Sequence, residues 1–200
     1  RERGWWEEFR DELGGSLVEF ETEASQIRTF EALLVPGLLQ TADYARAVFI
    51  GGQVLDPVTV ERRVQARMAR QQILERDYPP TLWVVIDEAA LVKHVGGPAT
   101  MREQLRHLAT MAARPNIGIQ VLPNAVGAHA AMTGPFAILS YPNADDADLV
   151  YVETGADGDL YLEGPQEVER YTLRYDHVRA SALSADISAA YLVDLARQLK

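Results

Sequence analysis

The sequence contains no cysteine, which excludes disulfide bonds, a thiolate nucleophile and cysteine-ligated zinc. Lysine is almost absent, with only Lys93 and Lys200, and the formal net charge is −10. Affinity for nucleic acids rests largely on Lys and Arg side chains that neutralise phosphates. We therefore do not expect this chain by itself to bind duplex DNA.

Long apolar runs are also lacking. The longest one, residues 82–86, has the length of a strand, whereas a membrane-spanning helix needs about 18 to 20 residues. The first residues are charged and aromatic and do not have the pattern of a signal peptide, and there is no initiating Met. We expect a cytoplasmic protein without membrane association, trimmed from a longer chain.

The charged residues that are present are unevenly distributed. Acidic residues dominate between residues 145 and 170, whereas arginines dominate between residues 61 and 76. One interpretation is that these charges pair within the molecule or are solvated. The other is a polar surface for a partner, for which Arg63, Arg67 and Arg70 are the candidates.

Apolar periodicity predicts mainly helices in the first 80 residues. The four predicted helices span residues 5–13, 16–34, 38–50 and 57–76, the last with Pro57 in its first turn. The sequence thus predicts one globular unit in which a helical portion, 1–80, packs on an α/β core, 81–200.

The core is predicted from two strand-like runs, 81–87 and 117–122, that enclose a helix over 101–113. Such an arrangement implies a right-handed crossover and a parallel pair of strands. Thr100 and Glu103 have the spacing of a capping box at the start of this helix.

The rest of the core is predicted to be antiparallel strands followed by two helices. Short strand runs follow at 136–141, 148–153 and 160–162, the last two as an antiparallel hairpin. Ser184 is expected to cap the final helix, and its buried face is expected to be formed by Ile187, Tyr191, Leu195 and Leu199. We therefore predict an α/β fold: a mixed sheet of about four to five strands with one parallel β-α-β unit and an antiparallel hairpin, flanked by N- and C-terminal helices.

Several segments carry a resemblance to a known family. They are LVPGLLQTADYARA at 34–47, DEAAL at 87–91, IQVLP at 119–123 and VYVE at 150–153. Together they resemble the C-terminal domain of actinobacterial, antitoxin-like transcription regulators of the xenobiotic-response-element (XRE) helix-turn-helix family, a domain of undefined function. In such proteins a DNA-reading helix-turn-helix precedes this domain, and it is absent from this chain.

The resemblance implies a regulatory domain rather than a DNA reader. Its partner would be a small-molecule effector or a small protein, and it would act on DNA only through the missing helix-turn-helix. The long helix from Pro57 and the terminal helices are the candidates for contacts in a homodimer, which would match an operator with two half-sites.

Candidate binding residues follow the predicted parallel strands. The loop 123–134 leaves the carboxyl end of a strand, where ligands collect in α/β sheets, so His129 and Met132 are candidates for the rim of a pocket. The alternative is a surface loop in which His129 is bonded to the backbone. Glu153 and Tyr151 are further candidates. Glu153 would lie either in water at a strand end or facing inward, paired with an arginine, for which Arg46 is the candidate, or with a ligand amine.

Asp87 and Glu88 end the first predicted core strand, where they would cap a helix or serve as polar groups of a pocket. No pair of histidines has metal-ligand spacing, no phosphate-binding glycine loop follows a strand, and no serine has the pattern of a nucleophile. We therefore predict no metal, no cofactor and no catalytic residue. Two alternatives stay open: an enzyme that acts on a small metabolite with His129 and Glu153 as acid–base groups, and a structural adaptor without a pocket.

Overall fold

A computed structural model of the chain describes residues 8–9, 17–53, 56–143, 145–154 and 158–199. The helix expected over 5–13 lies almost entirely outside the described residues. The strands are β1 (Gln26–Glu31), β2 (Thr81–Asp87), β3 (Ile117–Leu122), β4 (Phe136–Ser140), β5 (Leu149–Val152) and β6 (Leu160–Leu162). The helices are α2 (Leu17–Glu23), α3 (Ala42–Gly51), α4 (Pro57–Gln71), α5 (Glu88–Val92), α6 (Pro98–Met111), α7 (Pro165–Ser181) and α8 (Ala185–Gln198), with 3-10 turns η2 (Gly37–Leu39), η3 (Gln72–Leu74) and η4 (Asn124–Val126).

The six strands form one mixed sheet in the order β3-β2-β1-β4-β5-β6. β1, β2 and β3 run parallel, while β4, β5 and β6 are joined to them and to one another by antiparallel pairing. This confirms the predicted α/β fold, the parallel pair at 81–87 and 117–122, and the antiparallel hairpin. The sheet has one strand more than predicted.

The additional strand is β1, and it lies in the centre of the sheet. Ile27 pairs with Leu82 of β2 on one side and with Leu139 of β4 on the other. The prediction of a single helix over 16–34 is therefore wrong in its second half, since α2 ends at Glu23. Ile27 and Thr29 are buried on one face of β1, and Phe30 is fully buried on the other, because this central strand is covered on both sides of the sheet. The sequence pattern mixed strand and helix periods and was ambiguous by itself.

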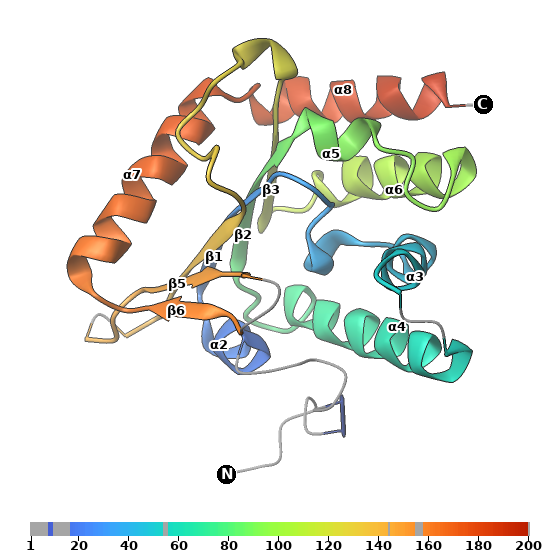
Figure 1. Cartoon of the computed structure of the whole chain (residues 1–200). Coiled ribbons are helices and arrows are strands. Elements are labelled where there is room, and N and C mark those ends of the chain that lie inside the picture. The colour runs from blue at the N-terminus through green and yellow to red at the C-terminus, as the bar shows by residue number, and fades with distance from the viewer. Residues whose placement is uncertain (1–7, 10–16, 54–55, 144, 155–157, 200) are drawn as a thin grey trace.

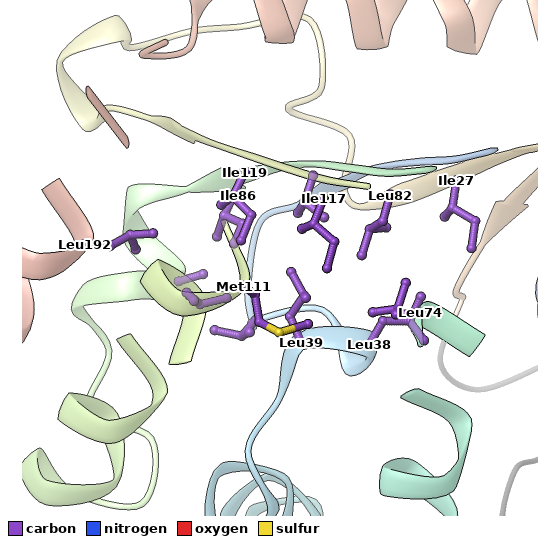
Figure 2. Packing of buried hydrophobic residues seen from close by; sticks show 14 of the residues in the cluster. Ile27, Leu38, Leu39, Leu74, Leu82, Ile86, Met111, Ile117, Ile119 and Leu192 are labelled. Atoms are coloured by element: carbon purple, nitrogen blue, oxygen red, sulfur yellow. The ribbon is translucent and has the colours of Figure 1, made fainter. Parts of the chain in front are cut away.

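Helices cover both faces of the sheet (Figure 1). α3, α4, α6 and α8 lie on one side and α7 lies on the other. Figure 2 shows the larger core, where Ile27, Leu82 and Ile119 point from the sheet toward Leu39 and Met111. The opposite face is sealed by Tyr175 and Val178 of α7, both fully buried. No helix among the described residues is long and apolar enough to span a membrane.

The corner between α7 and α8 closes the outer edge of β3. The Leu183 N–H donates to the Val121 carbonyl, and the Val121 N–H donates to the Ser188 hydroxyl, both at 2.9 Å. Ser184 caps α8, as predicted, by accepting from the Ile187 N–H. The predicted buried face of α8 is shifted by one residue, because Ser188, Leu192 and Ala196 are the buried positions and Ile187 is exposed.

The predicted capping box at Thr100 and Glu103 is wrong. α6 begins earlier, at Pro98, directly after Gly97 with its positive φ of 90°, and no side chain caps it. Pro is well suited to the first position of a helix because its missing N–H has no partner there in any case. Thr100 therefore lies inside the first turn rather than ahead of it.

Candidate functional site

The imidazole of His129 fixes the loop 123–134 instead of facing solvent. Its side chain is 8% exposed, and its ring packs edge-on against Phe30 with the ring centroids 5.4 Å apart. Nδ1 accepts a hydrogen bond from the Ala131 N–H at 3.2 Å, and Nε2 lies 3.7 Å from Oδ2 of Asp87. His129 is thus bonded to the backbone, while the neighbouring Met132 is exposed.

Asp87 and Glu88 tie this loop to two helices. Asp87 is the N-cap of α5, where its carboxylate accepts from the Ala89 N–H, so the capping interpretation is confirmed. Glu88 accepts from the Asn124 N–H at 2.7 Å and from the Tyr191 hydroxyl at 2.5 Å. These contacts hold the loop in place and engage the carboxylates of Asp87 and Glu88.

Arg46 lies on the surface, where α3 meets α4. Its guanidinium donates to both carboxylate oxygens of Glu61 and to Asp43. The predicted pairing of Arg46 with Glu153 is therefore wrong. Residues 43, 46 and 61 form a local surface network instead, since the two carboxylates are supplied by the same helix pair.

A different set of polar side chains gathers on the sheet beneath α2 and α4. Register places Thr29 of β1, Ala137 of β4 and Tyr151 of β5 in one row across three strands. Glu31 and Glu153 each follow two residues later in their segments, so strand alternation brings them to the same face, one row further along. We call this group the β1–β5 polar row: Thr29, Tyr151, Glu31 and Glu153.

Two arginines of α4 cover this row. Arg70 forms a bidentate pair with Glu21 of α2, with Nε–Oε2 and Nη2–Oε1 distances of 2.6 Å. Arg67 donates to Gln40 at 2.9 Å and is enclosed by Gly37, where a Cβ atom would lie only 2.9 Å from an Arg67 nitrogen. The absence of a side chain at Gly37 thus leaves room for the Arg67 guanidinium in its present position.

Burial perturbs the ionisation of these groups. Desolvation raises the pKa of Glu31 to about 7, and the negative charge of Glu153 adds to this effect, while the Thr29 hydrogen bond and the two arginines oppose it. Desolvation and the neighbouring Arg70 lower the pKa of Arg67 to about 10. The pKa of Tyr151 is raised by burial, by its hydrogen bond to Asp159 and by Glu153.

Two small adjoining cavities open along the polar row, and they share Thr29, Glu31, Ala137 and Tyr151 in their walls. The first, about 60 Å³, extends beneath α2 and α4. Its other lining residues are Leu17, Glu21, Ile27, Pro36, Gly37, Leu38, Arg70 and Leu82. The second, about 40 Å³, extends toward Pro135, Phe136 and Glu153. Charged groups and apolar walls converge here, as in sites for small molecules.

The structure therefore brings together some of the predicted site residues and separates others. Tyr151, Glu153 and Arg70 line this pair of cavities, and Arg67 lies beside them. His129, Met132 and Arg46 line neither cavity. Arg63 is half-buried on α4 and also lines neither one.

Sequence reasoning missed Glu21, Thr29 and Glu31. The last two belong to the strand that was predicted as a helix. In a strand, Ile27, Thr29 and Glu31 lie on one face, but the segment mixes strand and helix periods, so its sequence does not decide between the two. Glu21 could not be assigned to the site without that strand.

Two wider hollows lie elsewhere. One, of about 590 Å³, is bordered by Gly164, Glu167 and Arg170 at the start of α7, and the other, of about 470 Å³, by Trp83, Gln120 and Arg179. Both are open to solvent, and in the second the Arg179 guanidinium already stacks 4.4 Å from the Trp83 ring. The cavities along the polar row are less open to solvent and are therefore the stronger candidate.

Among the described residues, no group of three or more His, Asp or Glu side chains could hold a metal ion. A comparison with family models matches residues 15–194 to DUF5753, a domain of unknown function. No curated protein and no solved structure matches the chain.

Proposed function

The chain belongs to the DUF5753 domain family, and on this premise we propose that it is the effector-binding domain of a bacterial transcription regulator. The sequence resemblance at 34–47, 87–91, 119–123 and 150–153 supports the more specific assignment to actinobacterial regulators of the XRE helix-turn-helix type. In this proposal the DNA reader precedes the chain, and the chain itself, with its net charge of −10, does not read DNA.

The observation that carries the proposal is the charged pair of cavities along the β1–β5 polar row. Its walls come from α2, β1, η2, α4 and β5, so a bound molecule would contact parts of the chain that are far apart in sequence. A buried carboxylate and a buried guanidinium are costly to maintain, and their presence beside an empty volume is typical of binding sites.

The same cavities suggest how the binding of a ligand would affect a DNA reader that precedes the chain. Leu17 and Glu21 of α2 form one wall, and Glu21 is held by Arg70 of α4. A ligand whose apolar part contacts Leu17 would favour one position of α2 over another, by no more than its difference in affinity for the two positions. Since α2 (Leu17–Glu23) lies in the N-terminal part of the chain, such a shift would be passed toward a reader that precedes it.

A small molecule is a better candidate than a protein as the binding partner of the arginines of α4. Arg67 and Arg70 point inward, toward Gln40 and Glu21, and do not form a continuous outer surface with Arg63. Contacts of α4 or of the terminal helices in a homodimer stay a prediction. The enzyme alternative has no support from geometry, because His129 does not line the cavities that Glu153 and Glu31 border.

The proposal can be tested on the whole gene product. We expect the reading frame upstream of Arg1 to encode a helix-turn-helix, and we expect the Glu21→Gln variant of the complete protein to change operator affinity by at least about fivefold, the lower range of allosteric coupling. Glu169→Gln, an exposed position on α7, is the matched control. Fluorescence anisotropy with operator DNA measures both. A start codon near Arg1, or equal affinity of both variants and wild type, would contradict the proposal.

A further inference from the structure

The free charges that the two cavities present are carboxylates. Arg70 lines the first cavity, but its Nε and Nη2 atoms are already engaged by Glu21. Arg67 donates to Gln40 and is not a lining residue. An anionic ligand would therefore have to displace an existing ion pair.

Glu31 and Glu153 are differently placed. Glu31 lines both cavities, and its Oε1 lies 3.0 Å from the Thr29 hydroxyl, whose single proton has the Phe136 carbonyl, also at 3.0 Å, as a second acceptor. Its Oε2 accepts no hydrogen bond from the described part of the chain. Glu153 lines the second cavity and forms no ion pair with a described residue. Two carboxylates that repel one another across a small space are stabilised by a cation between them.

The residues that line the two cavities indicate which kind of cation would bind there. The Tyr151 and Phe136 rings border the second cavity, and aromatic faces attract organic cations. The first cavity adds the aliphatic side chains of Leu17, Ile27 and Leu38, which suit a short alkyl group. A bare metal ion fits poorly, since a chelating group of three His, Asp or Glu is absent from the described residues.

We propose that the cavities bind the ammonium end of a small organic amine, placed between Glu31 and Glu153 with its alkyl part directed toward Leu17 and Leu38. This inference rests on the proposed function and names its ligand class. The ammonium would donate to Glu31 Oε2, to Glu153 and to the Tyr151 oxygen, whose own proton is donated to Asp159. Volumes of about 60 and 40 Å³ together correspond to roughly three water molecules, which is the size of an ethylammonium ion.

The ligand class has a consequence for pH. A proton and an ammonium group compete for the same Glu31 carboxylate, whose pKa is raised to about 7 by burial and by Glu153 against the opposing effects of Thr29, Arg67 and Arg70. Glu21 is held by Arg70, and Asp159 by Tyr151, so neither takes part directly. Binding should therefore be strongest above pH 7 and weaken about tenfold between pH 8 and pH 6, because one proton competes.

The test is an NMR titration of the present chain with ethylammonium chloride at pH 8, in which the amide signals of Thr29, Glu31 and Tyr151 are followed. We expect saturable binding with a Kd on the order of 1 mM, close to the best that three non-hydrogen atoms achieve. Acetate and ethanol, of similar size but without a positive charge, should leave these signals unchanged.

Variants identify the binding groups. Glu31→Gln should weaken binding of ethylammonium at least tenfold and abolish the dependence on pH, and Glu153→Gln should weaken it several-fold. Glu169→Gln, with the same loss of charge on an exposed face of α7, should bind as wild type does. The NMR spectrum of each variant also reports whether it is folded. Wild-type affinity in Glu31→Gln, or equal binding of acetate at the same amides, would overturn the ligand class.

Different experimental results would contradict the ligand class and the proposed regulatory function. If acetate rather than ethylammonium occupies the cavities and changes the DNA affinity of the complete protein, the ligand class is wrong and the regulatory function stands. If ethylammonium binds through Glu31 but leaves DNA affinity unchanged, the ligand class stands and the regulatory function is contradicted.

Discussion

Arg70 and Glu21 form a bidentate ion pair that joins α4 to α2 in a largely buried position, with side-chain exposures of 16% and 6%. The exposed pair Arg106–Glu103 on α6 has a similar N–O distance, 2.7 Å, but both of its side chains are about 60% exposed. Both are Arg–Glu pairs, but the first is bidentate and buried between two helices, whereas the second has a single hydrogen bond and is exposed within one helix.

Glu21→Ala should lower the free energy of unfolding by about 3 kcal/mol, because it leaves a buried guanidinium without its counter-charge. Glu103→Ala should change it by less than about 1 kcal/mol, since exposed pairs are screened by water. Urea denaturation followed by circular dichroism measures both. A smaller loss for Glu21→Ala than for Glu103→Ala would show that the buried pair does not hold α2 to α4.

Glu31 should make stability depend on pH in the direction opposite to that of a salt-bridged carboxylate. Its pKa is raised from the usual 4.5 to about 7 in the folded state, so folding favours the protonated form. The contribution is fully present below pH 4.5 and is lost as the pH rises through 7. Relative to wild type, Glu31→Gln should gain up to about 3 kcal/mol between pH 5 and pH 8.

Comparing denaturation curves of wild type and Glu31→Gln at several pH values isolates this group, because the other titrating residues are common to both proteins. A difference in unfolding free energy that stays constant from pH 5 to pH 8 would mean that Glu31 titrates with an ordinary pKa.

Gly118 of β3 should not tolerate a side chain. A Cβ atom there would lie 2.6 Å from the Trp83 ring. The ring cannot easily move away, because its Nε1–H donates to Gln120 and Arg179 stacks on it. Gly118→Ala should therefore destabilise the fold by about 1–3 kcal/mol through overpacking. Gly51→Ala is the control, since its added Cβ would meet no atom within 4 Å apart from its chain neighbours and the nearby backbone of its own helix, and it should be neutral or slightly stabilising. Thermal denaturation of the two variants should order them in this way, and equal melting temperatures would disprove the steric argument.

His129 and Met132 should respond differently to truncation. His129→Ala removes a ring packed on Phe30 and a hydrogen-bond acceptor for the Ala131 N–H, so we expect a loss of about 1–3 kcal/mol. Met132 is 69% exposed, and Met132→Ala should change stability by less than about 0.5 kcal/mol. Melting temperatures distinguish a structural role of His129 from a binding role, because in a binding role the variant would lose ligand affinity and keep its stability. Unchanged stability in His129→Ala would contradict the structural role.

The parts of the fold that could be predicted from sequence are those whose local pattern has one physical solution. The run TLWVVID at 81–87 is too apolar and β-branched for a surface helix, and Asp56–Pro57 combines an N-cap with a proline that cannot lie deep in a helix. Both elements begin at the predicted residues. Ser184 and Asp87 were likewise predictable as caps, because a cap depends only on residues within one turn.

The candidate site could be predicted only in part because it depends on the pairing of distant segments. Residues 26–31 carry polar side chains at positions 26, 28, 29 and 31, which is not a strict strand alternation, and the strand is defined by its pairing with β2 and β4 on either side. Tyr151 and Glu153 were identified from an apolar run ending in a carboxylate, but their neighbours Thr29 and Glu31 come from over 100 residues earlier. The prediction that Arg46 pairs with Glu153 was wrong for the same reason. The sequence around Arg46 does not show that Glu61, on the next helix, lies against its guanidinium.

The central position of β1 determines where the polypeptide can be cut. A fragment that begins near residue 81 would retain five of the six strands, yet its two halves, β2–β3 and β4–β6, would face each other across a gap where β1 had paired with both. Each half would expose an unpaired edge with free N–H and C=O groups, which is a template for association with other molecules. Such a fragment should aggregate on expression, and supplying residues 17–80 as a separate chain should rescue it as a split protein.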